Sequence, residues 1–234
     1  MLRVVRPTVD WLLSHNKAAL LYSHAGNGTK EQRQINDTRL DHAMTKFTFL
    51  AAPLLVTLAA CAAEPNPPTV TESDVDRAMA EARRISALPA TSPLELPTGT
   101  VTYDGQIGAD VSGNANGSIL ADMTMHVGFA TGDIDGNVGN INLINPDGSP
   151  DQRLDGNLRI DGSERSGTID AVATGEVTGV DVDGFVVDSD MRLDLDGAVY
   201  NDVINGDAIY GNVDGRARGD FDLDIEGVFF GTQR

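Results

Sequence analysis

Cys61 is the only cysteine in the chain, and few kinds of cysteine chemistry are therefore possible for its thiol. An internal disulfide is excluded because there is no second cysteine. A zinc site of cysteine and histidine is excluded as well, because only one histidine, His126, follows Cys61. Acylation of the thiol is left, and the residues before Cys61 decide whether the sequence fits it.

Those residues have the order of an export signal. Lys46 precedes a run at 47–60 in which only two threonines and a proline are not apolar. The run is too short for a membrane-spanning helix, which needs about 20 apolar residues, but it suits the apolar region of a signal peptide. It ends in the letters LAAC, which resemble the lipobox of bacterial lipoproteins. The resemblance implies a signal peptide at 44–60, cleavage between Ala60 and Cys61, and diacylglyceryl and palmitate groups on Cys61.

Two or three acyl chains on one residue give stable anchoring, where one chain does not. We therefore expect Cys61 to hold the mature chain on the bacterial outer membrane, at the cell surface. The alternative is a buried helix that happens to end in a cysteine.

Residues 1–43 match no targeting pattern. They begin with some apolar character and then turn polar. We expect Met44 to be the true start, and residues 1–43 to be an upstream extension that is disordered or not translated. The alternative is a long genuine leader. Replacing Met44 with a residue that cannot start translation separates the two, because it abolishes the protein only in the first case.

The charge of the chain changes sharply at Cys61. The whole sequence has 35 acidic and 17 basic residues, of which four acids and seven bases precede Cys61, leaving 31 acids and ten bases. All ten of those bases are arginines. Such a surface repels nucleic acid and anionic lipid head groups, so we expect neither as a partner through charge attraction. The plainest use of the acidity is solubility.

The segments after Cys61 predict a spacer and then a helix. Residues 61–72 are rich in proline and have little to bury, which favours an extended tether between membrane and domain. Residues 73–90 predict a helix with acids in its first turn, arginines near its end and Pro89 as its stop. An apolar stripe at helical spacing (Val75, Met79, Ala82, Ile85) favours packing of this helix on the domain, or fraying in the tether, over binding of a partner.

From about Thr98 the apolar residues alternate with polar ones, which predicts strands with one dry and one wet face. The strands expected are 101–111, 119–129, 134–138, 154–160, 169–177, 191–199, 209–217 and 221–229. Turn sequences rich in Gly, Asn, Asp and Pro separate them, and no helical segment intervenes. We therefore predict an all-β fold, a single eight-stranded antiparallel up-and-down barrel over 98–234. Because the alternate face is Asp, Thr, Arg and Asn, the apolar face points inward and the barrel is soluble.

Three segments of this barrel resemble the β-barrel domain of transferrin-binding-protein-B-like lipoproteins. They are GTVTYDGQIGADV, ADMTMHVGFATGDIDGNVGNINL and GDFDLDIEGVFFG. Within the second, GDIDGNVGNI at 132–141 is similar to an "SGxIxN"-like segment of that family. The residues from Gly227 to Gly231 are similar to its closing signature, without the glycine pair that ends it. The resemblance implies a bacterial surface lipoprotein that binds host iron carriers, complement regulators or haem-bearing proteins. This chain has room for one barrel and no handle domain, so transferrin itself is not expected.

Other residues that could do chemistry have simpler explanations. Acidic clusters at 133–137, 181–184, 188–190 and 220–224 lack the order of a calcium-binding loop, and the last predicts a charged outer face. His126 falls on the polar face and has no serine nucleophile assigned to it, so we expect no enzyme and no catalytic residue. Met123 and Met125 alternate inward, where core filling is favoured over haem ligation. We expect no metal and no cofactor, and a monomer.

Two function classes remain open. One is a surface-displayed binding module that recognises a protein or an iron or haem source through loops at one rim of the barrel. The other is a structural lipoprotein facing the periplasm, or one that holds a small apolar ligand in the barrel. Large inward residues disfavour the second, and protease treatment of intact cells separates the two.

Overall fold

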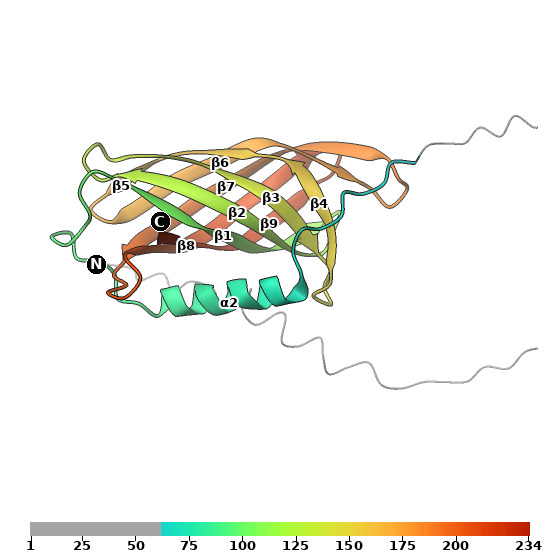
Figure 1. Ribbon diagram of the computed structural model, residues 1–234. Helices are drawn as coiled ribbons and strands as arrows, with labels where there is room; N and C mark the ends of the chain where they lie inside the picture. The colour runs from blue at the N-terminus through green and yellow to red at the C-terminus, as the bar shows by residue number, and fades with distance from the viewer. Residues whose placement is uncertain (1–61) are drawn as a thin grey trace, which may run out of the picture. The chain divides into compact units, whose positions relative to one another are not determined.

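The computed structural model describes residues 62–234, which form one helix and nine strands (Figure 1). The helix is α2 (Glu72–Ser86). The strands are β1 (Thr100–Gly113), β2 (Gly117–Gly128), β3 (Asp133–Ile144), β4 (Pro150–Gly156), β5 (Leu158–Arg165), β6 (Thr168–Val180), β7 (Val186–Tyr200), β8 (Ala208–Gly219) and β9 (Leu223–Gln233).

The strands close into an antiparallel barrel. Consecutive strands pair with each other except for β4 and β5, and β9 returns to pair with β1 over Tyr103–Gly113. Strands β4 and β5 share one position in the wall, because both pair with β3 on one side and with β6 on the other. The predicted eight-stranded antiparallel barrel is therefore confirmed.

The strand expected at 154–160 is interrupted at Asn157, where β4 ends and β5 begins. The register of β3 against β4 and β5 changes at the same level, and the register of β2 against β3 shifts between Leu120 and Asp122. On β3, Asn140 has a φ of 50°, a left-handed conformation typical of a bulge. β3 thus has one extra residue relative to β2 at this point. That residue is left out of the hydrogen-bond ladder, and the wall bends there.

The inward side chains fill the barrel with a single apolar core. The alternating residues of β1, β2 and β9 lie inside it as predicted, among them Tyr103, Met125 and Phe229 with no exposed surface. The ring of Phe229 lies over the glycine pair Gly197 and Gly211, where a methyl group at either position would come within 2.6 Å of the ring. A large side chain opposite small ones lets the strongly coiled wall pack without a void.

Helix α2 packs on the outside of the barrel, across β8, β9 and β1 (Figure 1). It is shorter than the predicted 73–90, because its C-cap is Ala87. Its stripe is buried as expected, with Ala78 added to the four residues named above. It covers a second apolar cluster on the outer face (Leu120, Ile144, Ala208, Tyr210, Val228, Phe230). The prediction of an entirely polar outer face is therefore wrong at this place.

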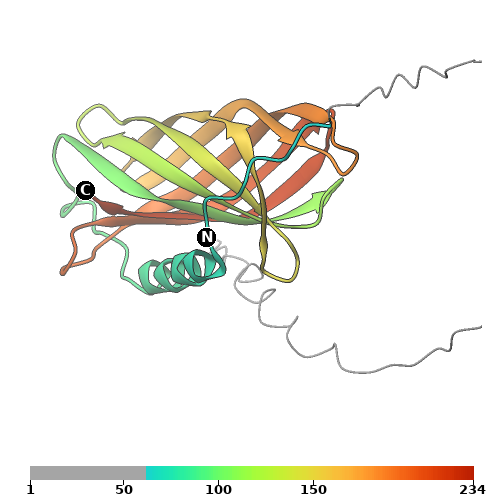
Figure 2. The same ribbon diagram turned by 45° about the vertical axis from the view of Figure 1, so that its right-hand side comes forward.

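Residues 62–71 are extended, as the prolines predict, but they do not form a free spacer. They run along the outer wall across β4 (Figure 2). Arg153 N–H donates to the carbonyl of Asn66 over 3.0 Å, and Thr69 N–H donates to Asn142 Oδ1 over 2.8 Å. These residues are therefore held on the barrel wall, because polar groups on β3 and β4 provide hydrogen-bond partners for them.

The barrel has two unlike ends. We call the end with the β1–β2, β3–β4, β6–β7 and β8–β9 turns the hollow end, and the end with the β2–β3, β5–β6 and β7–β8 turns the capped end. In the part of the chain from residue 62 onward, no helix is long and apolar enough to cross a membrane.

Candidate functional site

The sites predicted at Ala60 and Cys61 lie outside the described residues, as do the signal peptide at 44–60 and the extension at 1–43. The residue that follows Cys61 is described, however, and its place on the barrel is informative. The other predicted residues lie on the barrel wall and in its core.

His126 is half-buried on the outer face of β2. Its Nδ1 lies 2.9 Å from Thr102 Oγ1 on β1, its directly opposite cross-strand neighbour. Asp135 stands opposite it on β3. Because His126 and Thr102 are directly opposite each other on neighbouring strands and their side chains are in contact, they form a structural cross-strand pair. Met123 and Met125 lie in the core with almost no exposed surface, in agreement with core filling.

The acidic residues of the outer wall form a row across four strands. Asp110, Glu226, Asp214 and Asp194 stand opposite one another on β1, β9, β8 and β7. Like charges directly opposite on neighbouring strands repel. Within residues 62–234, no three acidic, histidine or cysteine side chains come together in a way that could hold a metal ion.

Asp196 is the next acidic residue along β7, and its pKa is shifted. Partial burial raises the pKa of the Asp196 carboxyl, and the charges of Asp170, Asp194 and Asp214 raise it further. Because the charged form of Asp196 is disfavoured in the folded state, this residue destabilises the barrel at neutral pH.

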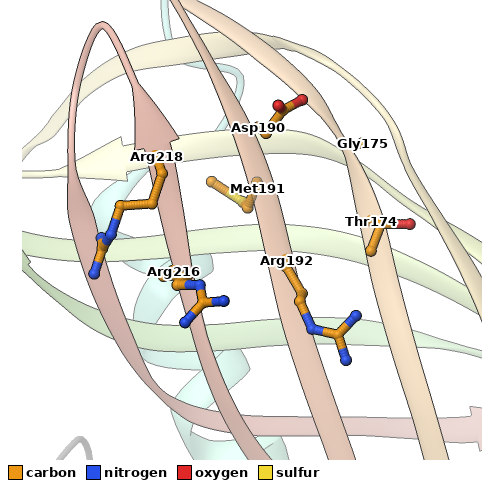
Figure 3. Close-up of a pocket in the computed structure, with 7 residues that line it drawn as sticks. All are labelled: Thr174, Gly175, Asp190, Met191, Arg192, Arg216 and Arg218. Atoms are coloured by element: carbon orange, nitrogen blue, oxygen red, sulfur yellow. The ribbon is translucent and has the colours of Figure 1, made fainter.

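Three of the ten arginines that follow Cys61 line a shallow depression of about 390 Å³ on the outer wall near the hollow end (Figure 3). Arg192 pairs with Asp194 over 2.7 Å, and Arg218 pairs with Asp224. Arg216 stands opposite Arg192 on β7 and opposite Asp224 on β9. Since carboxylates of the wall already pair with two of these arginines, the depression is best explained as local charge balance.

The hollow end has a cavity of about 340 Å³ and an apolar turn beside it. The cavity is lined by apolar residues from five strands and the adjoining turns, among them Leu143, Val187 and Phe221, and by polar residues such as Asp151 and Gln152. The β6–β7 turn, which joins Val180 to Val186, exposes Val182, Phe185 and Val186 to 103 %, 67 % and 58 %.

This turn has a defined conformation. Asp181 Oδ1 accepts hydrogen bonds from the backbone N–H groups of Asp183 and Phe185, each over 2.9 Å. Gly184 has a φ of +82°, which a side chain there would not favour. The three apolar side chains are therefore held outward by a fixed turn.

The chain from Cys61 reaches the barrel at this same turn. Ala63 N–H donates to the carbonyl of Gly184 over 2.9 Å. A methyl group at Gly184 would lie 2.8 Å from Ala62 Cβ, so the first described residue is in contact with the turn. Figures 1 and 2 show both segments at the same end of the barrel. The sequence did not indicate this proximity, because Ala62 and Gly184 are far apart in the chain.

The capped end is closed by the segment between α2 and β1. Thr91 N–H donates to the carbonyl of Val199, and Asn201 N–H donates to the carbonyl of Pro89, each over 2.9 Å. Leu96 from the same segment packs against the barrel core. Arg84 of α2 forms an ion pair of 2.5 Å with the buried Asp202 of the β7–β8 loop.

Two buried polar groups near the capped end lack partners. Tyr103 Oη and Thr91 Oγ1 have no hydrogen-bond partner among the described residues. Burial raises the pKa of the Tyr103 hydroxyl, and the charges of Asp207 and Glu164 raise it further. The Tyr103 hydroxyl is therefore held in its neutral form. Apart from it and Thr91 Oγ1, the buried side-chain polar atoms of the described residues have hydrogen-bond partners.

The capped end also presents exposed apolar residues. Leu94, Val203 and Ile204 are exposed to 97 %, 87 % and 85 %. They belong to the closing segment and to the β7–β8 loop, which are joined by the bridge between Ala90 and Tyr200. The molecule thus has an apolar group of side chains at each end of an acidic barrel.

The fold defines the class of this protein as a closed eight-stranded antiparallel β-barrel with one helix packed on its outer face. Comparison with family models, with curated proteins and with solved structures gives no match.

Proposed function

We propose that this chain is a lipoprotein of the bacterial outer membrane whose barrel is a binding module displayed on the cell surface. Cys61 carries the acyl chains. The barrel recognises a protein, or an iron or haem source, through its capped end.

The observation that carries the proposal is the exposure of Leu94, Val203 and Ile204 on adjoining segments of that end. Large apolar side chains gathered on the surface are typical of interaction sites. Loops that a rigid barrel holds in place are where barrels usually bind their partners.

The position of Ala62 supports the choice of the capped end. Ala62 contacts the β6–β7 turn at the hollow end, and in this proposal the mature chain begins one residue earlier, at Cys61. A tilted strand of about 12 residues spans about 30 Å along the barrel axis. An anchor on Cys61 therefore leaves the capped end about that far from the acyl chains, where a partner can reach it.

The proposal is tested on intact cells and with purified protein. The intact mass of the mature chain should show Cys61 as the first residue with its acyl groups, and Cys61→Ala should release the chain from the membrane. Protease added to intact cells should digest the barrel. Resistance in cells together with digestion in lysates would contradict surface display.

Partner recognition is tested by capture of proteins and haem from the surroundings of cells grown with and without iron. Val203→Asp and Ile204→Asp should abolish capture, because a charge replaces an apolar contact. Thr174→Asp on the outer wall adds the same charge away from the capped end and should leave capture unchanged. Equal loss in all three variants would refute a role for the capped end.

One observation favours a second candidate, a periplasm-facing lipoprotein that holds a small apolar ligand. The cavity at the hollow end, about 340 Å³, is within the usual size of a ligand pocket. The filled core speaks against a ligand deeper in the barrel. A fatty acid with an environment-sensitive fluorophore that binds wild type but not Phe221→Asp would support this candidate. Resistance of the barrel to protease on intact cells would support it as well.

A further inference from the structure

The β6–β7 turn is the most apolar exposed feature at the hollow end. Among the described residues of the hollow end, Val182, Phe185 and Val186 are the large apolar side chains that are exposed. Val182 also lines the cavity beside the turn, together with Val187 and Phe221. The apolar surface of this end is therefore continuous from the tip of the turn into the cavity.

The turn is also where the chain from Cys61 meets the barrel. Ala62 contacts Gly184, and Ala63 N–H bonds to the Gly184 carbonyl over 2.9 Å. Consecutive Cα atoms are about 3.8 Å apart, so whatever Cys61 carries begins within about 10 Å of the turn. A lipid anchor at that distance would bring this end of the barrel to the membrane surface.

We propose that the hollow end faces the lipid bilayer and that the β6–β7 turn inserts Val182, Phe185 and Val186 into its interface. The proposal rests on the proposed acylation of Cys61. An aromatic and two branched aliphatic side chains on a rigid turn can bury their apolar surface among the lipid glycerol and upper acyl groups.

The charges of the turn select the kind of lipid. Asp181 precedes the apolar residues, and Asp183, which is exposed, lies between Val182 and Phe185. Anionic head groups would repel these carboxylates and the acidic barrel behind them. The surface expected is zwitterionic, such as one of phosphatidylethanolamine and phosphatidylcholine.

The barrel acts as a second attachment in this arrangement. The acyl chains alone would leave its orientation free, whereas the turn fixes the hollow end toward the lipid. The capped end, with Leu94, Val203 and Ile204, then points away from the membrane.

Tryptophan fluorescence of the mature lipoprotein tests the inference. The only tryptophan in the sequence, Trp11, precedes Cys61, so the mature chain contains none. Phe185→Trp places a probe on the turn, and Ile204→Trp places a matched probe at the capped end. Both proteins are reconstituted into zwitterionic vesicles with brominated acyl chains, and their acylation is measured by intact mass.

We expect the brominated lipid to quench the Phe185→Trp probe at least about twofold and to leave the Ile204→Trp probe unchanged. Val182→Asp with Val186→Asp in the first protein should remove the quenching without changing the acyl mass. Replacing half of the lipid with phosphatidylglycerol should weaken the quenching because of the acids on the turn.

An acylated protein whose Phe185→Trp probe is not quenched would overturn the inference and leave the proposed function standing. Equal quenching of both probes would also overturn it, because the barrel would then have no fixed orientation. A blue shift without quenching would indicate a contact between two copies in place of the membrane, with the same consequence. A mature chain without acyl mass would refute the proposed function, and the inference with it.

Discussion

The docking of α2 on the barrel can be tested by removing the side chain of Ile85. This residue has no exposed surface and lies in the cluster between the helix and the outer face of β8 and β9. Ile85→Ala leaves the helix backbone unchanged, because alanine is the better helix former. A loss of stability therefore reports on packing, because the gain in helix propensity acts in the opposite direction.

The expected cost follows from the atoms removed. Ile85→Ala deletes three buried carbon groups, and each contributes about 0.8 kcal/mol by its transfer from water. The loss from transfer is then about 2.4 kcal/mol, and a residual cavity raises the total to about 3–4 kcal/mol. For a domain of this size each kcal/mol lowers Tm by about 2–4 °C, so Tm should fall by about 6–16 °C.

Thermal and urea unfolding of the mature chain, followed by circular dichroism, measures this loss. Asp76→Ala on the exposed side of the same helix is the control, and its effect should stay within about 0.5 kcal/mol. Helix and barrel should unfold together in one transition. If the helical signal were lost at a lower temperature while the barrel kept its Tm, α2 would not be part of the cooperative unit, and the reasoning would be refuted.

Three further changes test the charges and the buried hydroxyl. Asp196→Asn should raise the free energy of unfolding at pH 7, because the raised pKa of Asp196 means that its charged form destabilises wild type. Wild type should gain stability as pH falls through that pKa, so the difference in stability between the two proteins should close below about pH 4. Asp202→Asn should do the opposite, since hydrogen bonds from Asn205 and Arg84 lower the pKa of Asp202: it should lose stability at pH 7, and the difference should shrink as acid protonates wild type. Urea titrations at several pH values check both signs, and equal shifts for the two variants would contradict them. Tyr103→Phe should stabilise the barrel by about 1 kcal/mol, because it removes a buried hydroxyl without a partner among the described residues, and a clear loss of stability would show that the hydroxyl is satisfied.

The barrel was predictable because its information is local. In β1, β2 and β9 the core residues recur at every second position, and Gly, Asn and Asp mark the turns. A period of two fixes which face is dry, and an uninterrupted series of hairpins leaves closure as the way to pair both edges.

The outer apolar cluster was not predicted, although the sequence contains a sign of it. At Val228-Phe229-Phe230 and Ala208-Ile209-Tyr210, consecutive residues are apolar, so both faces of the strand are buried. Only α2 can cover the outer face there, and the stripe on α2 was already visible. Matching the helix to its place on the barrel requires knowing which strands lie side by side.

The candidate sites show the same division between local and distant information. The prediction of an export signal and of acylation at Cys61 rests on a short stretch of sequence. The contact between Ala62 and Gly184 cannot, because it depends on the path of residues 62–71 along the wall. In the β6–β7 turn, Val182 and Phe185 stand among Asp and Gly residues, which is a local sign of the membrane contact proposed for this turn.

The docked path of residues 62–71 also determines how the molecule would respond to mechanical load. A pull on an anchored N-terminus would reach Ala63, Asn66 and Thr69 one after another, and each is held by only one to three hydrogen bonds. Such bonds peel singly at low force, whereas strands paired along their length must be sheared together. Ten residues released in this way would give about 35 Å of slack. If the proposed anchor and partner exist, a pull from the partner would draw the barrel away from the membrane by this distance without unfolding it.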